Sequence, residues 1–211
     1  MSTRLRIGLV AALFAAVPPL EGQLQLPEPV GYVNDFANVI PAAERQQIES
    51  IIDEVRAKSG GEIVVVTLPT LGGRSRDEVG LQIGREWQIG QSGAPGDRAR
   101  NTGSVVLVVP SEREWKIETG LGTMTFITAA EAGRIGRDLM VPHFPDGNFG
   151  QGILMAVAAL AQAYADEFDF QITGEIPELP EPSGGDGDRP NLTLIFVVLL
   201  LLYFFFANRR G

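Results

Sequence analysis

The chain has 211 residues, of which 26 are acidic and 17 are Lys or Arg, so its formal net charge is -9. This acidic balance excludes a typical nucleic-acid binder, because binding a phosphate backbone requires clustered Lys and Arg. The sequence has no Cys, which excludes disulfides, zinc–thiolate sites and a cysteine nucleophile, and its single His excludes a multi-histidine metal site. A mean hydropathy of +0.10 beside this charge indicates that apolar residues are concentrated in particular segments.

Residues 1–22 predict a secretory signal peptide. Arg4 and Arg6 form a basic start, an apolar run follows at 7–17, and two prolines end it. At about 1.5 Å per residue, this run is too short to cross a bilayer core of about 30 Å. No clean Ala-x-Ala motif marks a cleavage point, so an uncleaved N-terminal anchor is the alternative.

Residues 191–208 predict a transmembrane helix that anchors the protein in the cell membrane by a single span. The run at 192–207 is apolar on every face, which argues against a buried core helix. Arg209 and Arg210 follow it, so the positive-inside rule places residues 209–211 in the cytoplasm. The middle of the chain, with its folded domain, is then expected in the periplasm or at the cell exterior, in agreement with the predicted signal peptide.

Residues 171–190 predict an extended tether between a folded domain and this anchor. The segment holds four Pro, four Gly and five acidic residues, and it cannot bury enough apolar surface to fold. What remains, residues 30–170, is long enough for one domain with its own core.

The first half of this domain predicts two helices and one buried strand. Apolar residues at helical spacing indicate a helix at 42–59, which Gly60 ends. A β-branched run at 62–68 predicts a strand covered on both faces. A second helix is expected at 75–88, with Ser75 as its N-cap.

The second half predicts a β-hairpin followed by two helices. The strands at 104–109 and 114–119 are separated by a short polar turn. Helices are expected at 128–140, capped by Thr128, and at 148–168. Together the elements predict an α/β fold: an αβα sandwich whose central, mostly parallel sheet contains one hairpin and carries helices on both faces, plus the C-terminal transmembrane helix.

Three polar segments could converge at the strand ends, where ligands gather in such sheets. They are 34–35, 90–103 and 118–122. Asp35, Glu118 and Asn101 would supply the oxygen ligands that calcium or magnesium accepts. Two alternatives remain open, because Asp35 could instead brace the start of the first helix and Glu118 could be a solvated strand residue paired with an arginine.

Gly120 and Gly122 complete the candidate ligand-binding residues. Their spacing is too short for a dinucleotide fingerprint and predicts a tight strand-to-helix turn that requires positive φ.

Several short motifs occur in an order and spacing that identify a family. They are Tyr32-Val-Asn-Asp-Phe-Ala37, Gly61-Glu-Ile-Val-Val-Val-Thr67, Glu86-Trp-Gln-Ile-Gly90, Asn101-Thr-Gly-Ser-Val-Val-Leu107, Lys116-Ile-Glu-Thr-Gly-Leu-Gly122, Ala132-Gly-Arg-Ile135 and Asn148-Phe-Gly-Gln-Gly152. Over residues 30–168 the chain resembles the TPM domain, a family named for a thylakoid lumen protein, a photosystem II repair protein and a nematode receptor modulator.

The resemblance implies an αβα sandwich in an exported, membrane-tethered protein. It also implies a role in the maintenance or assembly of membrane complexes, and for some members acid phosphatase activity with divalent-metal binding. Three positions where the family usually has acidic residues differ here: they hold Arg100, Met124 and Ala129, and Thr125 replaces a usual glycine. A hard cation needs several anionic oxygens close together, so this chain is expected to bind metal weakly.

Two functions follow from these observations. The first is a non-catalytic interaction module that acts on neighbouring membrane proteins. The alternative is a divalent-metal-assisted phosphatase acting on phosphate monoesters. In that enzyme Asp35 would be the base or metal ligand, with Glu118 as a further metal ligand, and Arg113 and Asn101 would steady the phosphate.

Overall fold

The computed structural model describes residues 25–91, 94 and 96–180, and the described residues up to Pro177 form one compact unit. The predicted signal peptide and the predicted transmembrane helix lie outside the described residues. Among the helices that are described, none combines the length and the apolar character needed to cross a bilayer.

A four-stranded sheet forms the centre of the domain, in the order β1 (Val33–Asp35), β2 (Glu62–Thr67), β3 (Gly103–Val109) and β4 (Glu114–Thr119). The first three strands are parallel, and β4 returns antiparallel to β3 through a hairpin. All residues of β3 and all but the first of β2 are buried, as expected of strands that are covered on both faces.

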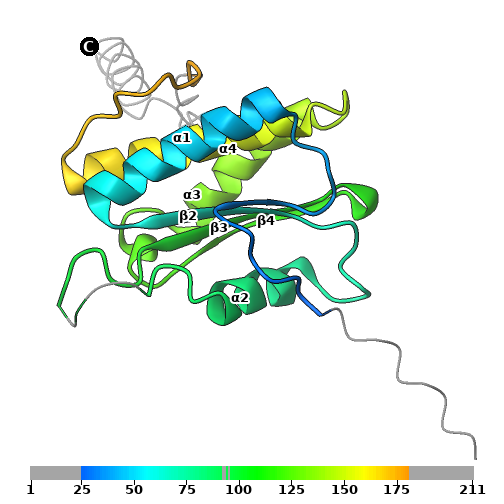
Figure 1. Cartoon of the computed structure of the whole chain (residues 1–211), viewed down its shortest axis with the longest axis horizontal. Helices are drawn as coiled ribbons and strands as arrows, with labels where there is room; N and C mark the ends of the chain where they lie inside the picture. Colours follow the sequence, from blue (N-terminus) through cyan, green and yellow to red (C-terminus); the bar gives the residue numbers. More distant parts are fainter. Residues whose placement is uncertain (1–24, 92–93, 95, 181–211) are drawn as a thin grey trace, which may run out of the picture. The chain divides into compact units, whose positions relative to one another are not determined.

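Helices cover both faces of this sheet. Figure 1 shows α1 (Ala42–Ser59), α3 (Ala129–Arg134) and α4 (Phe149–Phe168) on one face, and α2 (Arg76–Glu86) on the other. The α/β fold with its mostly parallel sheet and single hairpin is therefore confirmed.

Local signals explain the helix ends. The predicted bounds of α1 match the structure, and Gly60 ends this helix at a φ of 72°, in the left-handed region that glycine adopts without strain. The α2 helix begins with a capping box, in which Ser75 accepts a hydrogen bond from the Glu78 amide and the Glu78 carboxylate accepts one from the Ser75 amide.

Two elements differ from the sequence-based expectation. The strand β1 was not predicted, because three residues are too few to carry a pattern of alternation. The helix expected at 128–140 changes after Arg134 into a π-helix, Ile135–Met140. At this point Gly136 approaches Trp115 so closely that a Cβ would lie 1.9 Å from the indole ring.

The first residues of the predicted tether are bound to α1. The Glu54 carboxylate accepts hydrogen bonds from the Thr173 amide at 2.5 Å and the Gly174 amide at 3.0 Å. The Lys58 ammonium donates to Glu54 and to the Gln171 carbonyl oxygen. The extended tether therefore begins several residues later than the composition predicts, because one carboxylate satisfies two backbone amides.

The pKa of Glu54 reflects these hydrogen bonds between Glu54 and residues 173–174, which we call the clasp. Desolvation raises it, but the hydrogen bonds from Lys58, Thr173 and Gly174 outweigh that effect and lower the pKa to about 2. The clasp consequently contributes stability at pH values above about 4.5, the unfolded value, and loses it as the pH falls toward 2.

Glu54→Gln should release residues 171–174 from α1, because the neutral amide loses the ion pair with Lys58 and half of its acceptor capacity. We expect the Thr173 and Gly174 amides to exchange faster with deuterium, measured by NMR. Asp53→Asn is the control, since Asp53 is exposed and forms its ion pair with Arg56. Equal exchange in both variants would contradict the clasp.

Candidate functional site

Two loops interlock at the edge where β2 and β3 begin. We call residues 100–103 and 120–125 the loop edge. The Gly120 amide donates to the Gly103 carbonyl oxygen at 2.7 Å, and the Gly122 amide donates to that of Asn101 at 2.9 Å. A Cβ at Gly120 would lie 2.5 Å from the Asn101 carbonyl oxygen, and one at Gly122 would lie 2.7 Å from that of Arg100. The two glycines are therefore needed for close backbone approach.

The expectation of positive φ at these glycines is wrong. Gly122 has a φ of -69°, and Gly120 is also outside the left-handed region. It is Asn101 that adopts a φ of 62°, a conformation that Asn tolerates better than most residues. The residue with positive φ is therefore Asn101, in the loop 100–103, and not a glycine of the loop 120–125 as the glycine spacing indicated.

A buried tyrosine forms hydrogen bonds with both loops of the loop edge. The hydroxyl of Tyr164, on α4, donates to the Thr102 carbonyl oxygen at 3.1 Å. It also lies 3.2 Å from the Ser104 hydroxyl and 3.1 Å from that of Thr123. Burial raises the pKa of Tyr164 to about 12, which keeps the phenol neutral and able to donate.

The outer surface of the loop edge carries no acidic side chain. Arg100 and Asn101 are exposed, and so are Leu121 and Met124, whose exposed fractions are 78% and 46%. Within residues 25–91, 94 and 96–180, His and acidic side chains form no group of three that could hold a metal ion. The loop edge therefore offers a guanidinium group, an amide and two apolar side chains, and no general base.

Asp35 lies at the opposite end of the sheet and acts as a structural brace. Its carboxylate accepts hydrogen bonds from the Val39 amide at 3.0 Å, the Ile40 amide at 2.9 Å and the Thr67 hydroxyl. The Arg45 guanidinium lies 3.9 Å away, and the Asp35 side chain is only 2% exposed. This arrangement matches the alternative in which Asp35 braces the start of the first helix.

An open depression of about 480 Å³ adjoins this brace, lined by Asp35, Asn38, Val39, Ile40, Pro41, Ala42 and Arg45. Asp35 is the only acidic residue among them, and its oxygens are already engaged with the loop and Thr67. The depression therefore offers no free pair of carboxylates for metal binding or for general acid–base chemistry.

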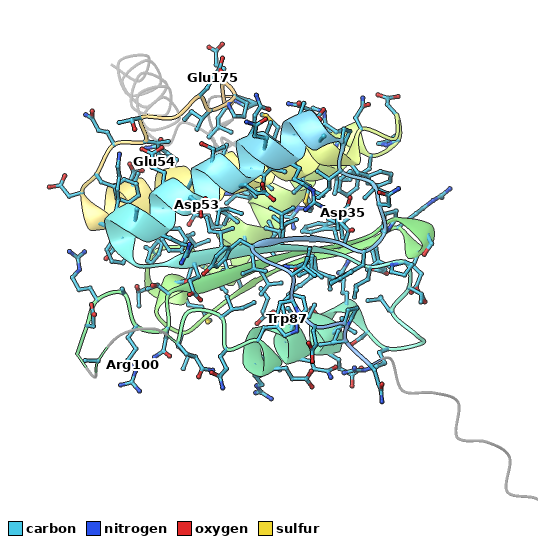
Figure 2. All side chains as sticks on the ribbon, in the orientation of Figure 1. Asp35, Asp53, Glu54, Trp87, Arg100 and Glu175 are labelled. Carbon is cyan, nitrogen blue, oxygen red and sulfur yellow. The ribbon has the colours of Figure 1, made fainter. Side chains whose placement is uncertain are left out.

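The other candidate residues do not join Asp35. Arg113 is exposed in the hairpin turn, and Glu118 lies 3.5 Å from Lys116 on the side of β4 that faces α2. Figure 2 shows Asp35 and Arg100 at opposite ends of the domain.

The expected convergence of the three segments is therefore wrong, because strand direction separates them. Asp35 pairs with Thr67 at the end of β2, whereas Glu62 at its start pairs with Gly103, roughly 16 Å away at about 3.3 Å per residue. The antiparallel β4 ends beside the start of β3, so only Asn101, Gly120 and Gly122 come together.

Sequence reasoning missed the residues that define the loop edge. Tyr164 falls in the apolar stripe of its helix, so its hydroxyl gave no signal of its own. Leu121 did carry a signal, because an apolar residue between two glycines in a turn has few ways to become buried.

The fold and the loop edge define an α/β sandwich domain with a rigid, glycine-dependent edge. A family profile described as the TPM domain matches residues 33–163. The chain therefore belongs to the TPM domain family.

Solved structures agree with this assignment. The N-terminal domain of a protein from P. gingivalis is 26% identical, with a TM-score of 0.59, over 68% of this chain and 88% of that one. The BA42 protein from the psychrophilic bacterium Bizionia argentinensis shares the fold, with 16% identity, a TM-score of 0.51 and coverage of 66% and 91%. No curated protein matches the chain.

Tyr164→Phe should lower the free energy of unfolding by about 1–3 kcal/mol, because the buried Ser104 hydroxyl loses its partner and the Thr102 carbonyl and Thr123 hydroxyl each lose one of two hydrogen bonds. Urea denaturation followed by tryptophan fluorescence measures this change. Tyr32→Phe is the matched control, since Tyr32 makes no side-chain hydrogen bond among the described residues, and equal losses would contradict the role of Tyr164.

The free energy of unfolding of the native protein should also fall as the pH rises from about 10 to about 12, and it should fall less in Tyr164→Phe.

Proposed function

We propose that this protein is a non-catalytic interaction module, anchored in the cell membrane with its TPM domain outside the cytoplasm. It acts on neighbouring membrane proteins in the maintenance or assembly of their complexes. The observation that carries this proposal is the set of side chains at and beside the loop edge. Arg100 and Met124 within it, and Ala129 at the start of α3, stand where the family resemblance leads us to expect acidic residues.

The chemistry of the loop edge argues against metal-dependent catalysis. Calcium and magnesium bind where several carboxylate or carbonyl oxygens converge. Here a guanidinium group and a thioether are exposed instead, and a cation would be repelled by Arg100. Asp35 does not compensate, because it lies at the other end of β2 and holds the loop before α1.

The phosphatase alternative requires residues that the fold keeps apart. Asp35 and Asn101 lie at opposite ends of the strands. Arg113 lies in the hairpin before β4, and the strands β2 and β3 separate β4 from β1, which carries Asp35. A phosphate ester bound at one of these residues would not reach the others. The alternative therefore has only the family resemblance in its favour.

Restoring the acidic residues should create a metal site on the existing frame. We expect the triple variant Arg100→Asp, Met124→Glu, Ala129→Asp to show a calcium-dependent rise in melting temperature, while the native protein shows none. The native protein should also fail to hydrolyse p-nitrophenyl phosphate with or without calcium or magnesium. Robust metal-dependent turnover by the native protein would refute the non-catalytic assignment.

The interaction itself is testable in membranes. Chemical cross-linking of the full chain, followed by affinity purification, should recover a defined set of membrane proteins. A chain ending at Pro180 is the control, because it keeps the domain and lacks the predicted anchor that holds it near its partners. Equal recovery by both chains would contradict the need for anchoring, and recovery of no partner by the full chain would contradict the interaction role.

A further inference from the structure

The loop edge presents two apolar side chains to solvent on a rigid backbone. The described residues contain four large hydrophobic side chains that are exposed, and two of them, Leu121 and Met124, lie in this one turn. Thr123 between them is fully buried and donates to the Gly103 carbonyl oxygen at 2.9 Å. Because the backbone is already held, the two side chains can be buried against another surface without the cost of ordering the loop.

A cationic group accompanies this apolar pair. Arg100 is exposed, and its carbonyl oxygen is the atom that a Cβ on Gly122 would meet at 2.7 Å. Among the described residues no ion pair of Arg100 is recorded, whereas Arg98 in the same loop is paired with Glu167. The guanidinium group of Arg100 therefore remains available for an oxyanion such as a phosphate.

The α4 helix ends beside this same edge. Arg98 donates to the Glu167 carbonyl oxygen at 2.6 Å near the end of α4, and its guanidinium group lies 5.1 Å from the centre of the Phe168 ring. The Phe168 ring is in turn 6.0 Å from that of Phe126, which follows the loop edge directly. The α4 helix therefore ends at the end of the domain that carries Leu121 and Met124, and residues 171–174 continue from there along α1, held by Glu54 and Lys58.

The predicted tether and anchor would hold the domain near the bilayer, so that contact between the two resembles an intramolecular reaction. Thirteen residues, 178–190, lie between the compact unit and the predicted anchor, and a flexible chain of that length has an end-to-end distance of about 5–6 Å × √13, roughly 20 Å. A surface held this close to the membrane experiences an effective concentration on the order of millimolar, so a weak contact suffices to keep it docked. Arg100 is the single charged residue among 100–103 and 120–125, so the apolar pair must carry most of the contact.

We propose that the loop edge docks on the surface of a phospholipid bilayer. Leu121 and Met124 insert among the lipid headgroups, and Arg100 binds a lipid phosphate. This inference rests on the membrane anchoring in the proposed function and adds an orientation to it: the loop edge faces the bilayer, and the exposed side of α2 remains available to partners. A protein partner for this edge is the competing outcome.

Depth measurements by electron paramagnetic resonance test the proposal in the full chain. The protein has no Cys, so Leu121→Cys gives a single site for a nitroxide label. In nanodiscs of phosphatidylcholine and phosphatidylglycerol that each hold one copy, the label should collide several-fold more with oxygen than with a water-soluble nickel complex. Leu81→Cys, at an exposed apolar residue of α2, is the matched control and should favour the nickel complex.

A second substitution separates docking from local packing. Met124→Asp in the Leu121→Cys background should move the label into water while the chain stays in the disc. A label at residue 121 that is as accessible to nickel as the label at residue 81 would overturn the docking and leave the anchoring intact. A label shielded from both reagents would indicate a protein contact and also overturn it. Failure of the chain to enter the discs would instead refute the anchoring itself.

Discussion

The domain depends on the close approach of two backbones at the loop edge. The antiparallel return of β4 brings residues 120–122 onto residues 100–101, and only glycines leave space for the carbonyl oxygens between them. The Tyr164 hydroxyl then reaches both loops from α4 and occupies a place that water would otherwise need to fill. Helix layer and sheet edge are thus joined by polar contacts within an otherwise apolar core.

The sequence was informative wherever the determining interactions are local. The periodic isoleucines of α1 and the capping box of α2 lie within a few residues of the ends that they define, and both helices were predicted closely. The Tyr164 contacts join residues 41 to 62 positions apart, and no local pattern records such a pairing. Similarly, the three residues of β1 form a strand only because the edge of β2 is available to them.

The candidate site was predicted less well for a related reason. Asp35, Asn101 and Glu118 have suitable oxygen atoms, but their chemistry says nothing about which edge or face of the sheet receives them. The end of the sheet at which a residue lies depends on the direction of its strand. The face depends on the alternation of side chains along the strand, which places Glu118 toward α2 and beside Lys116. Asp35 also illustrates that a buried carboxylate at the end of a strand more simply satisfies the amides of the following loop than awaits a ligand.

The loop edge separates the requirements of the fold from those of function. Arg100, Asn101 and Met124 contribute backbone atoms to the interlocked loops, while their side chains point into solvent. Exchanging a carboxylate for a guanidinium group or a thioether at these positions therefore leaves the hydrogen bonds of the frame intact. The same frame therefore tolerates different outward-facing side chains, and in this chain they form an apolar and cationic surface. Membership of the TPM family consequently determines the frame, and the outward-facing side chains determine what it binds.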